Sequence, residues 1–343
     1  MWQQTYATRA DMQQATYLSQ HALPFRHLLA AQQRSHLPAR RVLLFGGAII
    51  VLLTGGILIW FSIHGLLATP SAPLVPTPSA SYQTVMFGID AQHTHAISTE
   101  HTLTPQMVSH LVAGWTSFPA DGSLFSSPIV ADGMVYIGSL DGRLYAYRST
   151  GCAQSSCAQS PCAPRWYTTP TRDLITAAPA VAAHTVFVSS NDGTLYAFDA
   201  RGCAHAPCPP LWTSISTNVP LASSPAVVNN VVYVGSWDHR LYAFNANGCG
   251  KPSCQPLWTS IATDSIIESS PTIAGGVIYI GSVDEHLYAF DTAGCPASPC
   301  SPLWTSPALG ESIESSAMVA NGTVYIASLD HKLYTFHLPP PGS

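Results

Sequence analysis

Leu241-Tyr242-Ala243-Phe244 is one of five near copies of a single phrase, and the spacing of these copies decides the fold. The copies are Leu144 to Tyr147, Leu195 to Phe198, Leu241 to Phe244, Leu287 to Phe290 and Leu333 to Phe336. The last four begin 46 residues apart, and the first begins 51 residues before the second. A fixed period of this length, with four short strand-like runs in each unit, is typical of a β-propeller.

The third repeat shows the four runs most clearly. Residues 223–228 and 231–236 are two apolar runs joined by an Asn-Asn turn, whose residues tolerate the positive φ of a tight hairpin. The repeated phrase, residues 241–245, forms the third run, and the fourth opens on Leu257-Trp258. The sequence therefore predicts an all-β fold of four-stranded blades.

The order of the pieces suggests how the ends meet. The series begins with a lone tryptophan strand at Trp115 and ends with three strands over residues 315–336. If the Trp115 strand joins the last three, no strand is left over and no sheet edge stays open. We therefore predict a five-bladed β-propeller with terminal-strand closure. An open arrangement that dimerises, or further strands from residues 85–110, are the alternatives.

A long uncharged stretch precedes the repeats. Residues 42–67 contain no Asp, Glu, Lys or Arg, and about 20 apolar residues suffice to cross a bilayer as a helix. Arg40 and Arg41 stand at its start, so the positive-inside rule places the N-terminus in the cytoplasm and the rest of the chain outside. We predict a single transmembrane helix in the cell membrane. The alternative is a signal peptide cleaved near residues 68–72, although its apolar core is usually shorter.

Composition divides the remaining chain. Residues 1–41 form a polar cytoplasmic segment with a net charge of +4, and residues 68–84 form a Pro/Ser-rich linker. The propeller is expected over residues 85–337, followed by a tail, residues 338–343. Residues 69–343 carry 8 basic and 17 acidic side chains, a net charge of −9, which argues against nucleic acid as a partner.

All nine cysteines follow the predicted membrane helix, as expected for an oxidising compartment. They recur as Cys-x4-Cys at the same place in each repeat, which predicts the disulfides Cys203–Cys208, Cys249–Cys254 and Cys295–Cys300. The first repeat holds Cys152, Cys157 and Cys162, and the sequence leaves open which one is unpaired. Zinc is the alternative for paired cysteines, but each pair stands alone, so no metal site is predicted.

These motifs resemble the pyrroloquinoline-quinone-type (quinoprotein) propeller repeat family, with this chain as a membrane-anchored member. The family repeats a Ser-Pro strand, a Val-Tyr-x-Gly-Ser strand, Asp-Gly-x-Leu-Tyr-Ala and then a Leu-Trp strand. Matching segments of the first repeat are Ser126 to Pro128, Val135 to Ser139 and Asp141 to Ala146, and the resemblance covers residues 85–337.

The resemblance implies two kinds of function. Quinoprotein dehydrogenases hold the quinone and a calcium ion over the central channel, whereas an outer-membrane scaffold lipoprotein of this repeat type only binds partners. This chain has five repeats rather than eight, no adjacent Cys-Cys pair and no dense carboxylate cluster for calcium. We therefore expect a non-catalytic binding or scaffolding module without a cofactor. A quinone- or metal-dependent oxidoreductase is the alternative, and the quinone is suggested by the resemblance alone.

Two sets of recurring residues are expected to be structural. An aspartate begins the same tight turn five times, where its side chain can bond its own backbone. A tryptophan recurs where neighbouring repeats must pack. These residues are Asp141, Asp192, Asp238, Asp284 and Asp330, and Trp115, Trp166, Trp212, Trp258 and Trp304.

Residues that break the repeat are the candidate ligand-binding site. Glu268 and Glu314 replace apolar or small residues where propellers of this type open the mouth of their channel. Turn residues expected on the same face are also unusually polar or aromatic: Trp237, His239, Arg240, Glu285, His286, His331 and Lys332. Convergent polar groups at a concave mouth predict a site for a protein or small-molecule ligand, with an ordinary solvated rim as the alternative.

Strand direction adds a hypothesis about orientation. The cysteine-bearing loops should share one face of the propeller, directed toward the membrane, while the Glu268/Glu314 mouth is directed away. Before the repeats, His93, His95, His101 and His110 could suggest a metal, but they lack flanking ligands and are expected to be ordinary polar residues.

Overall fold

The computed structural model describes residues 86–88, 90–91, 93, 103–152 and 161–339. The chain divides into two units, Met1–Pro73 and Leu74–Ser343, and every described residue belongs to the second. The predicted cytoplasmic segment, membrane helix and linker lie outside the described residues. Within the described residues, no helix is both long and apolar enough to span a bilayer.

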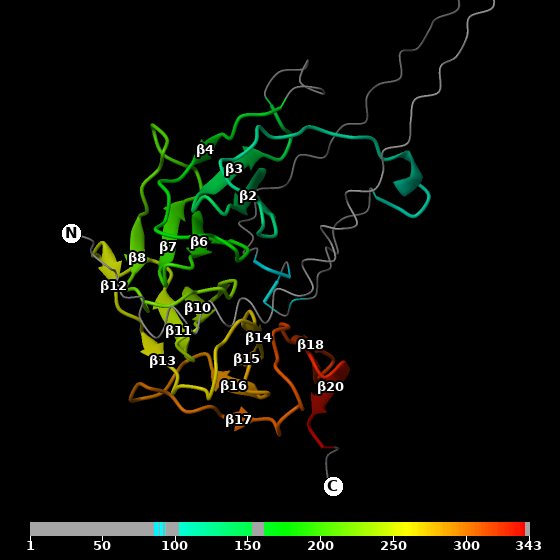
Figure 1. Cartoon of the computed structure of the whole chain (residues 1–343), viewed down its shortest axis with the longest axis vertical. Helices are drawn as coiled ribbons and strands as arrows, with labels where there is room; N and C mark the ends of the chain where they lie inside the picture. The colour runs from blue at the N-terminus through cyan, green and yellow to red at the C-terminus, as the bar shows by residue number, and fades with distance from the viewer. Residues whose placement is uncertain (1–85, 89, 92, 94–102, 153–160, 340–343) are drawn as a thin grey trace, which may run out of the picture. The chain divides into compact units, whose positions relative to one another are not determined.

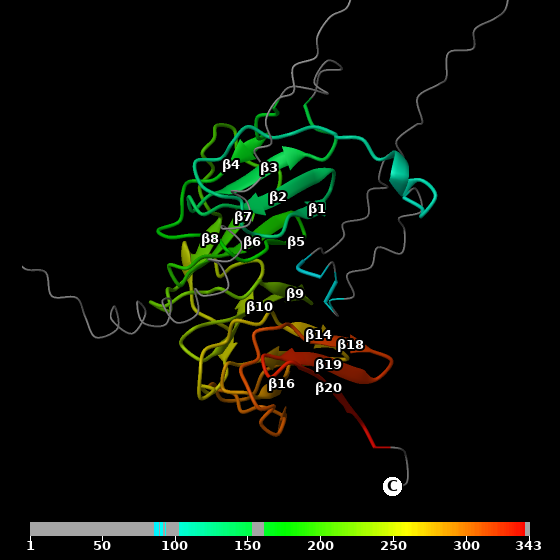
Figure 2. The same ribbon diagram turned by 45° about the vertical axis from the view of Figure 1, so that its right-hand side comes forward.

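Short strands form five sheets that follow one another along the chain (Figures 1 and 2). The first contains β1 (Ile129–Ala131), β2 (Met134–Gly138), β3 (Leu144–Arg148) and β4 (Trp166–Tyr167), and the second β5 (Ala180–Ala182), β6 (Thr185–Ser189), β7 (Leu195–Asp199) and β8 (Trp212–Ser214). The third contains β9 (Ala226–Val228), β10 (Val231–Gly235), β11 (Leu241–Asn245) and β13 (Trp258–Thr259), and the fourth β14 (Thr272–Ala274), β15 (Val277–Gly281), β16 (Leu287–Asp291) and β17 (Trp304–Thr305). The fifth contains β18 (Met318–Ala320), β19 (Thr323–Ser328) and β20 (Lys332–His337). The remaining elements are a short strand, β12 (Ser253–Cys254), and a 3-10 helix, η1 (Val108–His110).

Within each sheet the strands lie side by side in chain order and pair antiparallel. Successive sheets meet through their first strands, because β1 contacts β5, β5 contacts β9, β9 contacts β14 and β14 contacts β18. The prediction of an all-β fold built from four-stranded antiparallel sheets is therefore confirmed.

The predicted closure is wrong within the described part of the chain. The last sheet has three strands, and β20 has no strand on its outer side there. The Trp115 segment bonds to the first sheet instead: the Cys162 N–H donates to Thr116 O at 2.6 Å, and the Trp115 indole N–H donates to Ser149 O at 3.1 Å. β4 makes the same contact with the cysteine loop of the second sheet, where the Cys208 N–H donates to Tyr167 O at 2.8 Å. The Trp115 segment therefore has the loop contact of a fourth strand, but it is not paired with β20 in the described residues.

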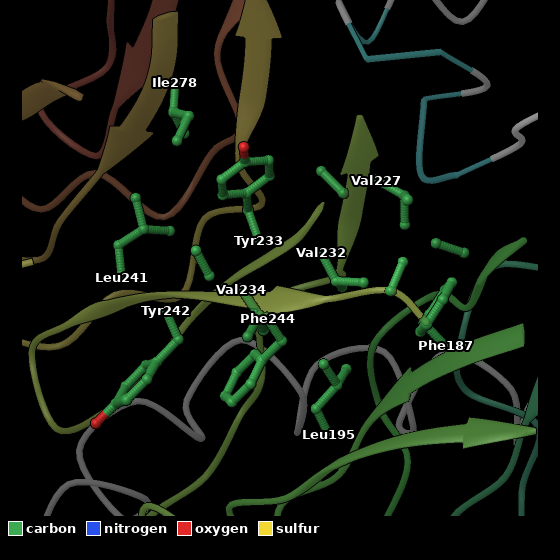
Figure 3. Close-up of a cluster of buried hydrophobic side chains, with 14 of the residues drawn as sticks. Phe187, Leu195, Val227, Val232, Tyr233, Val234, Leu241, Tyr242, Phe244 and Ile278 are labelled. Carbon is green, nitrogen blue, oxygen red and sulfur yellow. The ribbon is translucent and has the colours of Figure 1, made fainter. Parts of the chain in front are cut away.

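A cross-strand row explains the alanine in the repeated phrase. Tyr233, Ala243 and Trp258 are register partners on β10, β11 and β13, and all three are buried. The two aromatic ring centroids lie 6.0 Å apart, which the small alanine between them allows. Figure 3 shows Tyr233 directed toward Ile278 of the fourth sheet, so this face of the third sheet packs against its successor.

Close contacts join each sheet to the next. A Cβ built on Gly235 would lie 2.3 Å from Ile267 Cγ2, and Gly138 and Gly281 meet Ile175 and Ile313 in the same way. The backbone of Ile267 is held close to Gly235, because the Ile267 N–H donates to the O atom of the next residue, Ser236, at 3.1 Å. Glycine at the end of the second strand is thus required by a β-branched side chain of the following sheet.

We expect Gly235→Ala to destabilise the fold by about 1 to 3 kcal/mol through overpacking against Ile267. Ile267→Leu should recover part of this loss, because its branch point lies one carbon further from the backbone. A double-mutant cycle from urea midpoints measures the coupling. An equal cost of Gly235→Ala with and without Ile267→Leu would show that the two residues do not compete for space.

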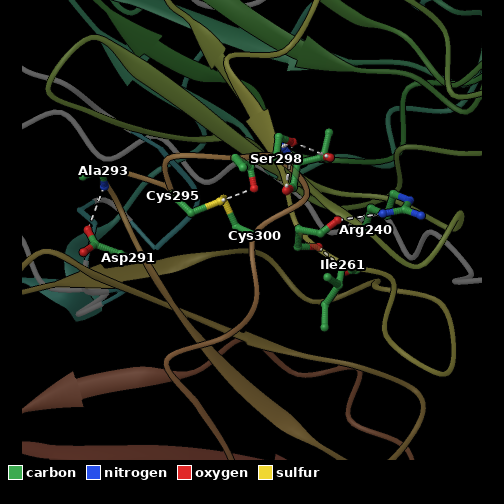
Figure 4. The surroundings of a disulfide bond; sticks show 10 residues. Arg240, Ile261, Asp291, Ala293, Cys295, Ser298 and Cys300 are labelled. Atoms are coloured by element: carbon green, nitrogen blue, oxygen red, sulfur yellow. Dashed lines mark hydrogen bonds between the residues drawn. A yellow bond between two sulfur atoms is a disulfide. The ribbon is translucent and has the colours of Figure 1, made fainter.

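The predicted disulfides are confirmed. Cys203–Cys208, Cys249–Cys254 and Cys295–Cys300 are bonded, with Cα–Cα distances between 5.5 and 5.7 Å. Figure 4 shows the last of these. In the first repeat Cys152 is bonded to Cys162, and Cys157 lies outside the described residues.

The cysteine loops also link sheets to one another. The Cys300 N–H donates to Thr259 O at 2.7 Å, and the Ile261 N–H donates to Cys300 O at 2.8 Å. β12 pairs with β8 in the same parallel manner. Each of these loops therefore lies parallel to the fourth strand of the preceding sheet and forms backbone hydrogen bonds with it.

Candidate functional site

The two predicted glutamates begin neighbouring sheets. Glu268 is half-buried just before β14, and Glu314 is exposed just before β18. Because β14 and β18 contact each other, the two residues occupy equivalent places on adjacent sheets. The structure thus places the pair as the repeat alignment predicts, and their role in binding stays a prediction.

Three of the predicted turn residues have a backbone role. His239, Glu285 and His331 have φ values of 71°, 75° and 69°, in the left-handed region that glycine favours. In the first two sheets this position is Gly142 and Gly193. The turn has this conformation in all five sheets, and the side chains differ: His239 Nδ1 lies 3.3 Å from Thr263 O, whereas His331 is exposed.

In the first, third and fourth sheets, the residue after this turn bonds across its own sheet. The Arg240 guanidinium donates to Ser260 O at 2.8 Å, and His286 Nδ1 lies 2.8 Å from Ser306 O (Figure 4 shows Arg240). Arg143 makes the same bond to Thr168 O at 2.7 Å. These side chains bind the carbonyl group at the end of the fourth strand.

The remaining members of the sector differ in their surroundings. Trp237 is half-buried, and its backbone N–H donates to Pro220 O at 3.1 Å. Lys332 forms an exposed ion pair with Asp330 at 2.8 Å. Exposed pairs of this kind contribute little to stability.

The five aspartates act inside the repeats. Asp284 shows the pattern: Oδ1 accepts the His286 N–H at 3.1 Å, and Oδ2 accepts the Tyr288 hydroxyl at 2.8 Å. Oδ2 also accepts the Asp264 N–H at 2.8 Å, from the loop that enters the sheet. The corresponding tyrosine bonds in the other sheets join Tyr145 to Asp141, Tyr196 to Asp192, Tyr242 to Asp238 and Tyr334 to Asp330. The tyrosine of the repeated phrase therefore fixes the turn.

Burial, together with these hydrogen bonds, raises the pKa of Tyr145, Tyr196, Tyr242 and Tyr288. Burial and the charge of Asp291 raise the pKa of Tyr233 to about 12. A phenol whose folded pKa exceeds its unfolded value of about 10 stabilises the fold fully below pH 10 and loses that contribution as the pH rises through the folded pKa.

We expect a tyrosinate absorbance titration to show a late step near pH 12 that coincides with loss of the far-ultraviolet circular dichroism signal. Tyr233→Phe should remove part of this step, because it deletes the phenol whose pKa burial and the charge of Asp291 raise to about 12. Ionisation of all tyrosines in one step centred on pH 10, with the fold intact, would contradict the assignment.

A series of serines links the sheets where their first strands begin. The Ala178 N–H donates to Ser224 Oγ at 3.0 Å, the Ser224 N–H to Ser270 Oγ at 3.1 Å, and the Ser270 N–H to Ser316 Oγ at 2.9 Å. Sequence reasoning missed this role, although the 46-residue spacing of the second serine in each Ser-Ser pair was a visible signal.

The segment before the repeats lies along the first strands. The Ile273 N–H donates to Ala91 O at 2.6 Å, and Met86 is buried in the core formed by the second, third and fourth sheets. His93 is buried with Nδ1 2.9 Å from Thr272 Oγ1, whereas His110 is exposed. His95 and His101 lie outside the described residues.

A cavity of about 580 Å³ lies between the fourth and fifth sheets, away from the predicted sector. Its lining includes Leu303, Trp304, Phe336 and Leu338. Trp304 is 40% exposed, whereas Trp166, Trp212 and Trp258 are buried. Sequence reasoning treated the five tryptophans as equivalent and missed this cavity.

Within the described residues, no cysteine loop of a following sheet covers Trp304. A Cβ built on Gly294, in the loop after β16, would lie 2.4 Å from the Trp258 ring, and Gly202 and Gly248 cover Trp166 and Trp212 in the same way. The fifth repeat has His337-Leu338-Pro339 in place of such a loop. Trp304 contacts only the edge of Phe336, at a centroid distance of 5.0 Å, and stays partly open to solvent.

The resemblance implies a quinone and a calcium ion, and the calcium part can be compared with the acidic side chains of the described residues. Calcium takes six to eight oxygen ligands. Across the described ranges, no three His, Cys, Asp or Glu side chains gather closely enough to hold a metal ion.

Part of the repeat region is similar to a known protein family. Residues 209–338 match a family model described as outer membrane protein assembly factor BamB. The match covers less than half of the chain, and it agrees with the resemblance to pyrroloquinoline-quinone-like propeller repeats. The predicted resemblance is thereby confirmed, whereas the predicted membrane anchor is not tested by it. No curated protein matches the chain.

Two solved structures are similar to part of the chain. BamB from Moraxella catarrhalis is 22% identical, with a TM-score of 0.48, over 64% of this chain and 63% of its own. The computationally designed Ika8 protein is 14% identical, with a TM-score of 0.48, over 62% of this chain and 57% of its own. The chain thus spans less than two thirds of the length of either protein.

Proposed function

We propose that this chain is a non-catalytic, protein-binding module that receives an apolar side chain of its partner in the cavity at Trp304. The observation that carries the proposal is the exposure of Trp304 beside a cavity whose volume falls in the range of ligand pockets, about 300 to 1,000 Å³. Tryptophan is among the residues that contribute most to protein interfaces. The match of residues 209–338 to an assembly-factor family supports a binding platform.

We further propose that residues 42–67 hold this module on the outer side of the cell membrane. The support is the uncharged length of the stretch, the flanking Arg40 and Arg41, and the disulfides of the repeats, which persist in oxidising compartments. Protease added to intact cells should then digest the repeats and spare the N-terminal segment. Protection of the repeats until the cells are lysed would contradict this location.

Position-specific crosslinking tests the binding site. Leu303 and Leu257 occupy the same place in successive repeats and are both exposed, but only Leu303 lines the cavity. A photoreactive amino acid at position 303 should give a defined crosslinked product on intact cells, and the same group at position 257 should not. Binding of the purified partner should weaken at least tenfold with Trp304→Ala and stay unchanged with Leu257→Ala. Equal products from both positions, or unchanged binding by Trp304→Ala, would refute the site.

A further inference from the structure

The two end sheets expose side chains that are buried at the same position in every other sheet. Leu333 on β20 is 67% exposed, whereas its counterparts Leu144, Leu195, Leu241 and Leu287 are buried. Leu124, before β1, is 40% exposed, whereas Ile175, Leu221, Ile267 and Ile313 are buried. Each internal leucine packs toward the following sheet, as Leu287 does against Ile313. Among the described residues, no sheet follows the last one and no complete sheet precedes the first.

The two exposed faces match one another in shape. At three internal junctions a glycine ends the second strand and an isoleucine of the following sheet packs on it: Gly138 with Ile175, Gly235 with Ile267, and Gly281 with Ile313. At the remaining internal junction both residues change, to Ser189 and Leu221. Leucine branches one carbon further out, which leaves room for a Cβ.

The exposed residues of the first and last sheets show the same pairing of residue sizes. Ala327 ends the second strand of the last sheet, and Leu124 precedes the first sheet. Alanine with leucine is the combination expected if these two residues meet, because the alanine Cβ excludes isoleucine.

The Trp115 segment supplies a second match. A Cβ built on Gly151 would lie 2.6 Å from the Trp115 ring, and Gly202 covers Trp166 in the same way. Ser117 bridges Cys162 in parallel, as Thr168 bridges Cys208. The segment thus holds the place of the fourth strand of a sheet preceding the first. The last sheet lacks such a strand beside β20 within the described residues.

We propose that the last sheet of one copy of this chain packs against the first sheet of a second copy. Leu333 and Ala327 of one copy then contact Leu124 of the other, and the Trp115 segment adds to β20 as its fourth strand. The partner is a second copy because Leu124 and Leu333 of a single chain both stay exposed. The interface joins two different surfaces, so two copies bury all four ends only if both contacts form reciprocally. Leu333, Ala327 and Leu124 do not line the Trp304 cavity, although Thr335 and Phe336 of β20 do.

Disulfide trapping tests the contact in the full-length chain, with Cys157→Ser to remove the odd cysteine. Cβ atoms built on Gly138, Gly235 and Gly281 lie 3.0 to 3.2 Å from the Cβ of their isoleucines, near the distance a disulfide spans. One tagged copy carries Ala327→Cys and a differently tagged copy carries Leu124→Cys. Mild oxidation of the mixture should give a disulfide-linked dimer that contains both tags. Ser189→Cys with Leu221→Cys in one chain is the positive control, and it should crosslink within the chain.

The result that would overturn the proposal is the absence of mixed dimers while the control bond forms. A variant that carries both Ala327→Cys and Leu124→Cys in one chain tests whether the two end sheets of a single chain meet. If the disulfide forms only within single chains, the chain closes on itself. Light scattering gives an independent measurement. Leu333→Asp should halve the particle mass, and Leu257→Asp, at an exposed site of an internal sheet, should leave it unchanged. Equal masses for both variants would also refute self-association.

Discussion

Trp212→Ala is expected to lower the free energy of unfolding by about 3 to 5 kcal/mol, the cost of deleting a large buried aromatic side chain. Trp212 is buried under the following sheet, where a Cβ built on Gly248 would lie 2.7 Å from the Trp212 ring. Its other neighbour is Phe187, at a centroid distance of 6.1 Å. Both contacts disappear together, and the surrounding backbone cannot collapse into the space. Urea denaturation followed by circular dichroism measures the loss.

Trp304→Ala is the matched control at the same repeat position. Trp304 is partly exposed beside the cavity, so water can occupy the space left by the ring. We expect a loss of about 1 kcal/mol. Equal losses for the two variants would mean that the fifth sheet covers its tryptophan as fully as the others do, and would remove the basis of the proposed site.

Ala243→Leu is expected to destabilise the fold by about 1 to 3 kcal/mol, because it inserts a branched side chain between Tyr233 and Trp258. Ala243 is fully buried, and the two ring centroids are 6.0 Å apart. The rings must separate, which also disturbs the junction with the fourth sheet, since the Tyr233 hydroxyl donates to Thr292 O at 2.9 Å. The urea midpoint of the variant measures this cost.

Thr335→Leu makes a comparable change in the last sheet. Thr335 is exposed and pairs with Tyr325, but no tryptophan strand follows it in the described residues. We expect a change within about 0.5 kcal/mol. A loss as large as that of Ala243→Leu would contradict the steric account of the alanine position.

Local regularity made much of the fold predictable. The repeated phrase with its aspartate turn fixed the positions of the second and third strands, because the turn, the tyrosine bond and the strand register all lie within a few residues of one another. The pairs Cys249–Cys254 and Cys295–Cys300 were predictable for the same reason, since each closes a loop of fixed length.

Features that depend on the ends of the array were not predictable. Trp115 was expected beside β20, but its partners are Ser149 and Tyr147 of the first sheet. The repeat pattern itself is the same for either arrangement, so it could not decide between them. The cavity at Trp304 escaped notice because it lies where no cysteine loop covers the tryptophan within the described residues, and no unusual residue marks it.

The serine hydrogen bonds between sheets all run in one direction along the chain, from the amide of one sheet to the hydroxyl of the next. The hydroxyl of Ser270 caps an amide of the sheet before it, and the amide of Ser270 is in turn capped by Ser316 of the sheet after it. A polypeptide whose repeats are exported in chain order would therefore carry one uncapped amide donor in the last exported sheet until the next repeat emerged. Truncation after the fourth sheet would strand the amide of Ser270, whereas loss of the first sheet would leave every hydroxyl-to-amide link in the remaining sheets intact.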